Sequence, residues 1–354
     1  MLKQIIKYSV SLVIAGVFFW LAFKDFTQSD LEKLWQMITG ANYSWLTVTV
    51  AIMVLSHIIR AWRWGVLLST VKEKMSLLNL FYATMIGYAV NMVLPRVGEV
   101  TKSVNLARQE KLDAKKVLAS VVIERILDTL MFAFLLAVSA FFFRTKINGA
   151  FGEVKLWGLN VSFEIATYLI LLASVALLTA FAILSLYPEK IAGWAETVLA
   201  KRSKKWAERI ANALRAFIEG TASLKNRAKY AEIVASSLVI WVLYLLGMLL
   251  PFYALSMQER YALGVMEALT TLSISGFGQL ITPAGAGTYQ YACQITLEKV
   301  FDVARVEASG FALITFALQT LTNASLGMIA FLAQAKEEAG VRAEQAIASE
   351  KPVA

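Results

Sequence analysis

Charged side chains inside otherwise apolar stretches are the first candidates for chemistry in this sequence. They are Arg60, Arg63, Glu124, Arg125 and Asp128. An ionisable residue inside a bilayer costs at least about 2.5 kcal/mol on insertion scales, so a functional role is the default hypothesis. Arg60 and Arg63 lie three residues apart and share a helix face, where their guanidinium groups could clamp a phosphate. Alternatively, both side chains extend along the helix to the membrane interface and bind no ligand.

The acidic residues of this set share one helix face. Glu124 and Asp128 are four residues apart, and Arg125 precedes Asp128 by three. One interpretation is a structural network of ion pairs. A sharper interpretation is that the acids orient the intramembrane arginines, or Arg96, and so hold an anion site ready while they balance its charge.

A first break in the apolar pattern could bring backbone groups to the same site. Its residues are Asn91, Pro95, Arg96, Gly98 and Glu99. Backbone amides and an arginine at such a break would suit a phosphate group, and Lys102 follows within one further helical turn. A solvated loop is the alternative interpretation.

A second break interrupts the apolar segment 268–297. As one helix this segment would be about 45 Å long, which is too long for a single comfortable crossing. Pro283, Gly285 and Gly287 divide it into halves that are each too short to span. Non-helical backbone at membrane depth persists only where it is buried in protein or lines a cavity, and broken helices of this kind build substrate sites in transporters. The alternative is an ordinary helix with a kink.

The composition indicates that the segments carrying these residues lie in a bilayer. The 354 residues are 58% hydrophobic and 17% charged, with a mean hydropathy of +0.62. Soluble globular chains are about 45–50% apolar and about 25% charged. A disordered chain, a disulfide scaffold and a collagen-like fibre are therefore excluded.

Cysteine, histidine and net charge narrow the chemistry further. The single Cys293 excludes an internal disulfide and a multi-cysteine metal site, and the single His57 argues against zinc chemistry and histidine-based triads. The formal net charge of +9 could indicate nucleic acid. In a polytopic membrane protein, however, basic residues mark cytoplasmic loops and attract anionic lipid. We expect no nucleic-acid partner, no metal and no cofactor.

The hydrophobic segments set the expected fold. They are 8–23, 45–68, 75–94, 117–143, 165–186, 233–257, 268–297 and 308–335. If all of them crossed the membrane from a cytoplasmic N-terminus, the basic stretches 96–116 and 187–230 would lie outside, against the positive-inside rule. Reversing the chain would instead put the basic terminus with Lys3 and Lys7 outside. Making 75–94 and 268–297 re-entrant places most basic residues on the cytoplasmic side. We predict an all-α polytopic membrane protein of about six crossing helices and two re-entrant broken segments that enter from opposite faces, with both termini cytoplasmic.

The rest of the chain connects these segments. The basic loop 187–230 contains an amphipathic stretch, 201–218, that predicts an interfacial helix. Residues 336–354 predict a short cytoplasmic tail that frays, which leaves 1–335 as the membrane domain. No phosphate-cradling glycine loop, serine-hydrolase elbow or zinc-protease helix motif is present in the sequence. An ATP-driven pump and a hydrolase are not supported.

Four motifs together carry a resemblance to a known family. They are Arg60-Ala61-Trp62-Arg63-Trp64, Asn91-x-x-x-Pro95-Arg96-x-Gly98-Glu99, Glu124-Arg125-x-x-Asp128 and Pro283-x-Gly285-x-Gly287. From about Lys7 to Ala335 the chain resembles the transmembrane domain of the lysylphosphatidylglycerol synthase family, also called the flippase-like or multiple-peptide-resistance-factor membrane domain. The resemblance implies a bacterial or archaeal inner-membrane protein that handles lipids.

In full-length relatives this domain looks like the part that translocates aminoacylated phosphatidylglycerol, while a separate soluble domain makes it. The present chain ends soon after its last span, so we expect it to lack the synthase domain. Many relatives look like Pro-Gly-Gly-x-Gly-x-x-Glu at the second break, where this sequence has Ala284 and Gln290. The missing carboxylate weakens the case for a preference for cationic headgroups.

The leading hypothesis is a lipid translocator, passive or gradient-linked, that moves a phospholipid or modified anionic lipid headgroup along a polar path. The path is expected to include Arg60, Arg63, Asn91, Pro95, Arg96, Gly98, Glu99, Lys102, Glu124, Arg125, Asp128, Pro283, Gly285, Gly287, Tyr289 and Gln290. Basic side chains would contact phosphate, acids would balance or gate them, and no residue would be catalytic. Membrane lipids, chiefly anionic phospholipids, are the expected partners, and a homodimer is left open.

Two other functions stay open. A membrane-embedded transferase could act on a polyprenyl-phosphate-linked substrate, with Glu99, Glu124 and Asp128 as base or metal ligands. Against it, no paired-carboxylate motif for a sugar nucleotide appears in a cytoplasmic loop. A scaffold could recruit partners through the basic loop 187–230, but membrane topology and attraction to anionic lipid explain that loop equally well.

Overall fold

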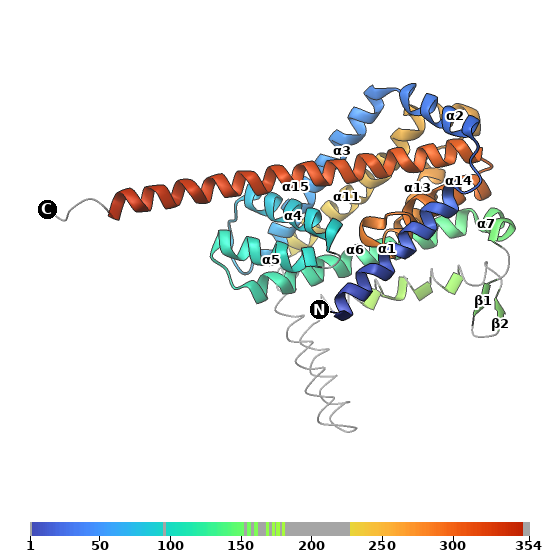
Figure 1. Ribbon diagram of the computed structural model, residues 1–354. Coiled ribbons are helices and arrows are strands. Elements are labelled where there is room, and N and C mark those ends of the chain that lie inside the picture. The colour runs from blue at the N-terminus through green and yellow to red at the C-terminus, as the bar shows by residue number, and fades with distance from the viewer. Residues whose placement is uncertain are drawn as a thin grey trace.

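The computed structural model describes residues 2–94, 97–151, 154–156, 159–161, parts of 168–180 and 227–349. These residues form a bundle of helices and one short antiparallel ribbon of two strands (Figure 1). In chain order the elements are α1 (Leu2–Phe23), α2 (Gln28–Thr39), α3 (Tyr43–Leu68), α4 (Leu77–Val93), α5 (Val97–Glu110), α6 (Ala114–Phe142), α7 (Arg144–Phe151), β1 (Val154–Leu156), β2 (Leu159–Val161), α11 (Arg227–Ala254), α12 (Met257–Tyr261), α13 (Val265–Gly278), the 3-10 helix η2 (Pro283–Gly285), α14 (Thr288–Val300) and α15 (Arg305–Ser349).

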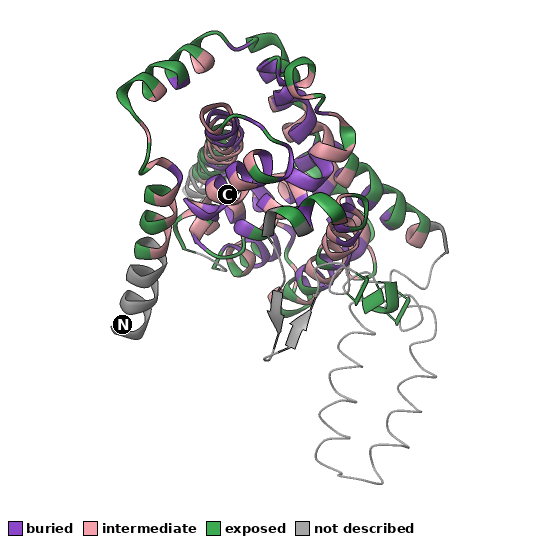
Figure 2. Cartoon of the chain, turned by 90° about the vertical axis from the view of Figure 1, so that its right-hand side faces the viewer, coloured by how far each residue is buried: buried purple, intermediate pink, exposed green. Residues whose placement is uncertain are grey.

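The predicted class, an all-helical polytopic membrane protein, is confirmed. The helices α3, α11 and α15 are long and apolar enough to cross a membrane, and shorter apolar stretches lie in α1 and α4. Burial gathers where the helices meet, while exposed residues cover their outer sides (Figure 2). Many of those exposed residues are large and apolar, such as Val234, Leu238 and Val242 on α11. An outer surface of this kind suits lipid rather than water. The predicted segment 165–186 and the amphipathic stretch 201–218 lie largely or wholly outside the described residues.

Polar caps begin α3 and α6, which carry most of the charged side chains inside the bundle, and also α4. The side chain of Asn42 accepts a hydrogen bond from the backbone amide of Ser44 at the start of α3. Asp113 does the same for Lys115 at the start of α6, and Ser76 caps α4. Such caps satisfy amides that have no partner within the helix, and this fixes where each helix starts.

The first predicted re-entrant segment is one leg of a helical hairpin made by α4 and α5. The two legs touch at Gly87 and Gly98, where a Cβ atom added to Gly98 would lie 2.0 Å from the carbonyl oxygen of Gly87. The side-chain oxygen of Asn91 accepts from the amide of Gly98 at 2.8 Å and ties the tip together. The basic stretch 96–116 is not a connecting loop for most of its length, because α5 packs back along α4 with Lys102 buried.

The second predicted re-entrant segment is also a hairpin, and a kinked continuous helix is excluded. The helices α13 and α14 pack against each other, and the chain reverses between them through η2. The hydroxyl of Thr288 donates to the carbonyl of Gly278 at 2.6 Å across the hairpin. Gly285 and Gly287 have φ angles of 76° and 78°, which explains why glycine is needed at the turn.

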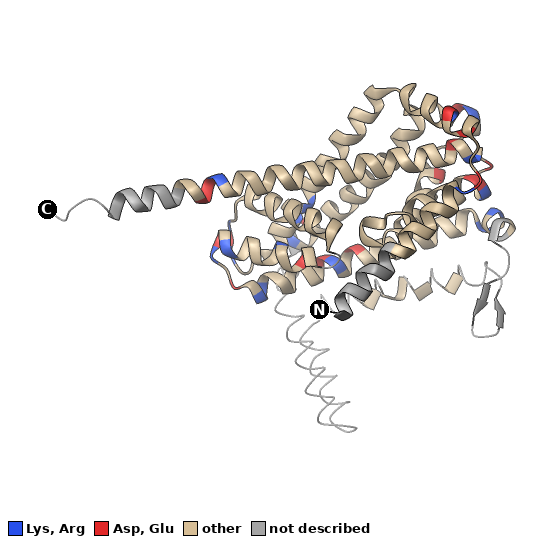
Figure 3. Cartoon of the chain, in the orientation of Figure 1, with Lys and Arg blue, Asp and Glu red and all other residues tan. Residues whose placement is uncertain are grey.

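The two hairpins enter the bundle from opposite ends. At one end Lys72, which follows α3, pairs with Glu110 at the open end of the first hairpin. At the other end Phe143 packs on Phe301, which follows α14, with ring centroids 5.0 Å apart. The tips approach each other inside the bundle, since α4 contacts η2. Charged residues gather at the two ends, with a small group between them (Figure 3).

The helix α15 runs well past the body of the bundle (Figure 1). Gln334 exchanges hydrogen bonds with Asn105 of α5, and Arg108 forms an ion pair with Glu338 at 3.1 Å. The tail that is expected to fray from residue 336 therefore continues α15 as helix to Ser349.

Candidate functional site

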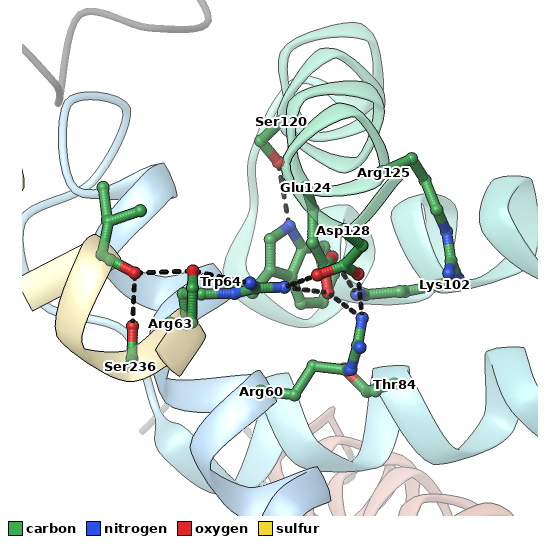
Figure 4. Close-up of polar contacts among 12 residues, drawn as sticks. Arg60, Arg63, Trp64, Thr84, Lys102, Ser120, Glu124, Arg125, Asp128 and Ser236 are labelled. Atoms are coloured by element: carbon green, nitrogen blue, oxygen red, sulfur yellow. Dashed lines mark hydrogen bonds and ion pairs between the residues drawn. The ribbon is translucent and has the colours of Figure 1, made fainter. Parts of the chain in front are cut away.

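Five charged side chains from three helices meet inside the bundle (Figure 4). They are Arg60 and Arg63 of α3, Lys102 of α5, and Glu124 and Asp128 of α6, and together they are called the buried ion cluster. The side chain of Arg63 is 0% exposed and that of Glu124 is 1% exposed. These charges are therefore shielded from both water and lipid, so each must be stabilised by its neighbours.

The two carboxylates bridge the three cations. Nη1 of Arg60 lies 3.1 Å from Oε1 of Glu124 and 2.5 Å from Oδ2 of Asp128. Nη2 of Arg63 lies 2.7 Å from Oδ1 of Asp128, and Nζ of Lys102 lies 2.7 Å from Oε2 of Glu124. All four carboxylate oxygens are thus engaged by cations from two other helices. The interpretation in which Arg60 and Arg63 extend to the membrane interface is wrong.

The buried ion cluster carries one unbalanced positive charge. It holds three cationic side chains and two carboxylates. An uncompensated charge in a medium of low dielectric constant is costly, and an anion that arrives beside it is stabilised. The cluster is an ion-pair network, as the plainer interpretation predicts, with one cationic side chain more than it has carboxylates.

Polar groups that the sequence analysis missed complete the cluster. The hydroxyl oxygen of Tyr244 accepts from Nε and Nη2 of Arg60 at 3.1 and 2.6 Å, and the hydroxyl of Ser237 accepts from Nη1 of Arg63 at 2.9 Å. Nζ of Lys102 lies 3.9 Å from the centre of the Trp64 ring. Ser237 and Tyr244 are seven residues apart on one face of α11, and that spacing of polar residues within an apolar helix is the signal that could have identified them.

A second ion pair lies beside the cluster but is separate from it. Nη2 of Arg125 lies 3.3 Å from Oε1 of Glu99, and both side chains are partly exposed. Arg125 leaves α6 on a different side from Glu124 and Asp128 (Figure 4). Glu99 and Arg125 line a groove of about 340 Å³ along α6.

The residues of the second break form local structure at the other hairpin tip. The side-chain oxygen of Gln290 accepts from the amide of Gly287 at 2.7 Å and caps α14. Tyr289 is buried and donates from its hydroxyl to Thr315 of α15 at 3.0 Å. Within the described chain, no hydrogen bond or ion pair joins Tyr289 or Gln290 to the buried ion cluster. Of the first break, Asn91 and Gly98 hold the hairpin tip, and the predicted site residues Pro95 and Arg96 lie outside the described residues.

Among the residues that the structure describes, no group of three or more histidine, cysteine, aspartate or glutamate side chains could hold a metal ion. The two carboxylates of the buried ion cluster are already taken by cationic side chains.

Comparisons with known proteins agree with the helical membrane architecture. A family model described as "Lysylphosphatidylglycerol synthase TM region" matches residues 6–327. A UPF0104 membrane protein of Methanocaldococcus jannaschii is 25% identical over 137 residues, which cover 38% of this chain and 40% of that protein. Another, from Methanothermobacter thermautotrophicus, is 23% identical over 285 residues, which cover 72% of this chain and 80% of the relative. No solved structure gives a significant match.

Proposed function

This chain belongs to the family of lysylphosphatidylglycerol synthase transmembrane regions, and from that premise we propose that it translocates a phospholipid across the membrane. The observation that carries the proposal is the buried ion cluster with its unbalanced positive charge. A lipid phosphate that reaches this cluster supplies the missing negative charge. The acyl chains stay in the bilayer while the headgroup passes through protein.

Arg60 offers the phosphate a suitable edge. Its Nε and Nη2 atoms form one edge of the planar guanidinium group, and both now donate to the single oxygen of Tyr244. Arginine uses this same edge to bind two oxygens of a phosphate at once. A phosphate that displaces the Tyr244 hydroxyl gains two charge-assisted hydrogen bonds in place of two bonds to one neutral oxygen.

The paired hairpins support a path through the protein. Each of them ends inside the bundle, and a helix that ends at membrane depth is stable only when protein or a polar cavity surrounds its free backbone groups. Transporters place substrate sites at such breaks. The first hairpin also delivers Lys102 to the cluster, so movement of this hairpin would change the cluster directly.

Lipid translocation in proteoliposomes tests the proposal. Headgroup-labelled phosphatidylglycerol and phosphatidylethanolamine are bleached from outside, and wild type is compared with Arg60→Lys and Asp128→Asn. We expect bleaching beyond the outer leaflet for wild type and at least a tenfold slower rate for both variants. Arg60→Lys keeps the positive charge but removes the paired Nε and Nη2 donors. A slower rate in a folded variant would therefore reflect lost phosphate recognition.

A matched control is Arg260→Gln. Arg260 forms an exposed pair with Glu307 at 2.6 Å, at the end of the bundle away from the cluster. Exposed pairs contribute little to stability, so this variant should transport as wild type does. Equal rates in wild type, Arg60→Lys and Asp128→Asn, with folding verified, would refute the site assignment.

A further inference from the structure

A groove on the outer side of α6 is not used by the proposed path through the cluster. It extends along α6 from Leu118 to Leu130, about 18 Å of helix, and Glu99 of α5 closes one side. The side chains of Leu118 and Val122 are 37% and 52% exposed, so the groove opens outward. Its lining is almost wholly apolar apart from Glu99, Arg125 and Thr129. The hydroxyl of Thr129 already donates to the backbone of its own helix.

The Glu99–Arg125 pair lies part-way along the long helix α6, away from both of its ends. Arg125 lies about 17 Å along α6 from its first residue, Ala114, which is roughly half the thickness of the hydrocarbon core. The second carboxylate oxygen of Glu99 and Nε of Arg125 are both buried, and neither finds a hydrogen-bond partner within the part of the chain that is described. One unsatisfied acceptor and one unsatisfied charged donor therefore lie side by side at the wall of an apolar groove.

The same two helices carry an ion pair on each side of their contact. On the inner side Lys102 of α5 pairs with Glu124 of α6, and on the outer side Glu99 of α5 pairs with Arg125 of α6. Glu99 and Lys102 are three residues apart, and Glu124 and Arg125 are adjacent. A headgroup held at the outer pair is thus separated from the buried ion cluster only by the contact between α5 and α6.

We infer that this groove is a lateral binding site for a phospholipid whose headgroup carries a hydrogen-bond donor. One acyl chain lies along the apolar wall of α6. When the lipid binds, the two partly exposed side chains turn toward the groove. The phosphate then accepts from Nε of Arg125, and a headgroup hydroxyl or ammonium donates to the free oxygen of Glu99. The inference rests on the proposed function only for the role of the bound lipid. In that role the lipid is a substrate bound at the groove before it reaches the buried ion cluster.

Photo-crosslinking in proteoliposomes tests the site. Four probes carry a diazirine on the acyl chain. Three are the phospholipids phosphatidylglycerol, phosphatidylethanolamine and phosphatidylcholine, and the fourth is an acetylated diacylglycerol, which has neither a phosphate nor a hydroxyl. Labelling at Leu118 and Val122 is compared with labelling at Val234, Leu238 and Val242. These three residues of α11 are 41–53% exposed and so report ordinary contact with bilayer lipid.

We expect phosphatidylglycerol and phosphatidylethanolamine to label the groove at least threefold more than the α11 face. Phosphatidylcholine, which has phosphate but no donor in its headgroup, should label it less. The acetylated diacylglycerol, which has neither phosphate nor donor, should label both faces equally. Equal labelling of the two faces by all four probes would overturn the inference.

Variants distinguish the contacts with the headgroup from the volume that the groove offers to the acyl chain. Arg125→Gln should remove the enrichment of every phosphate-containing probe, while Glu99→Ala should remove only the advantage of phosphatidylglycerol and phosphatidylethanolamine over phosphatidylcholine. Val122→Trp should fill the groove and abolish labelling, and Leu238→Trp on α11 should leave it unchanged. Enrichment that survives Arg125→Gln would show that the headgroup is not recognised here.

The test also separates this inference from the proposed function. Groove labelling that follows the expected order, in a protein that moves no lipid, would support the site and refute translocation. Translocation without groove enrichment would refute the site and leave translocation supported.

Discussion

The ammonium group of Lys102 lies 2.7 Å from Oε2 of Glu124, and it brings the first hairpin into contact with α6 at the centre of the bundle. Lys102 also lies over the ring of Trp64, which belongs to α3. One side chain therefore links α5 with both α3 and α6. Its charge gives the buried ion cluster its positive excess, and its contacts tie α5 to both neighbouring helices.

Replacing Lys102 by methionine should destabilise the protein by about 3–5 kcal/mol, because Glu124 would lose a buried cationic partner. The free energy of unfolding in detergent, from titration with a denaturing detergent, measures the effect. The double variant Lys102→Met with Glu124→Gln should recover a large part of the loss, since it no longer leaves a carboxylate oxygen facing an apolar side chain. Additive losses in the double-mutant cycle would contradict this coupling.

Tyr244→Phe should strengthen phosphate binding about fivefold, because it removes the neutral oxygen that now occupies the recognition edge of Arg60. Isothermal titration with a short-chain phosphatidylglycerol measures the dissociation constant. Arg60→Lys should weaken the same binding. If both variants weaken it to a similar extent, Tyr244 holds the lipid instead of yielding to it.

Gly98→Ala should destabilise the first hairpin by about 1–3 kcal/mol, since the added methyl group would meet the backbone of Gly87 at 2.0 Å. Gly247→Ala in α11 is the matched control, because nothing lies within 4 Å of its added Cβ atom. The control should be neutral or gain up to about 1 kcal/mol from the higher helix propensity of alanine. Unfolding free energies of the two variants that changed alike would argue against a close contact between α4 and α5.

Ala284→Gly should stabilise the protein by about 0.5–1 kcal/mol. Ala284 has a φ of 52°, a left-handed conformation that costs a residue with a Cβ atom about 1–2 kcal/mol, part of which the higher backbone entropy of glycine offsets. Gly285→Ala, at a φ of 76° and with Gln279 only 2.9 Å away, should have the opposite sign. A rise in unfolding midpoint for the first variant and a fall for the second would confirm the geometry of this turn.

The stability of the protein should fall at acid pH partly through Glu110, at the end of α5 and outside the apolar segments. Burial by itself raises the pKa of Glu110, but hydrogen bonds from Lys72, Asn79 and the amide of Ser76 outweigh it and lower the pKa below its ordinary value of 4.5. The stabilisation is thus present above about pH 4.5 and is lost as the pH falls through the lowered folded-state pKa.

Comparing wild type with Glu110→Gln isolates this contribution. At pH 7 the variant should be about 1–3 kcal/mol less stable, because the charged hydrogen bonds are lost. The difference should shrink when unfolding is repeated below pH 4.5, because the unfolded carboxyl then takes up a proton that the folded one, with its lowered pKa, binds less readily. A gap of the same size at both pH values would contradict the lowered pKa.

Much of the fold follows from residue types along the chain. Apolar runs of membrane length, interrupted by proline and glycine in two places, predict the helices and both re-entrant segments. The helix α5 escaped prediction because it is a polar stretch with no apolar run of its own. Its buried lysine is tolerated only because Glu124, 22 residues further on, neutralises it.

The candidate site was predicted in part. Arg60, Arg63, Glu124 and Asp128 stand out because a charge in an apolar segment is costly wherever the segment packs. Tyr244 and Ser237 did not stand out, since a hydroxyl within a membrane helix can bond to its own backbone and carries no comparable signal.

Residue types alone predict a helical membrane protein with charges inside its spans, because hydropathy and charge are properties of each residue. Which charges meet depends on how the helices pack. Arg60 and Asp128 are 68 residues apart, so no local spacing connects them. The adjacent residues Glu124 and Arg125 belong to different ion pairs, because successive side chains on a helix point about 100° apart and the neighbouring helices decide what each one faces.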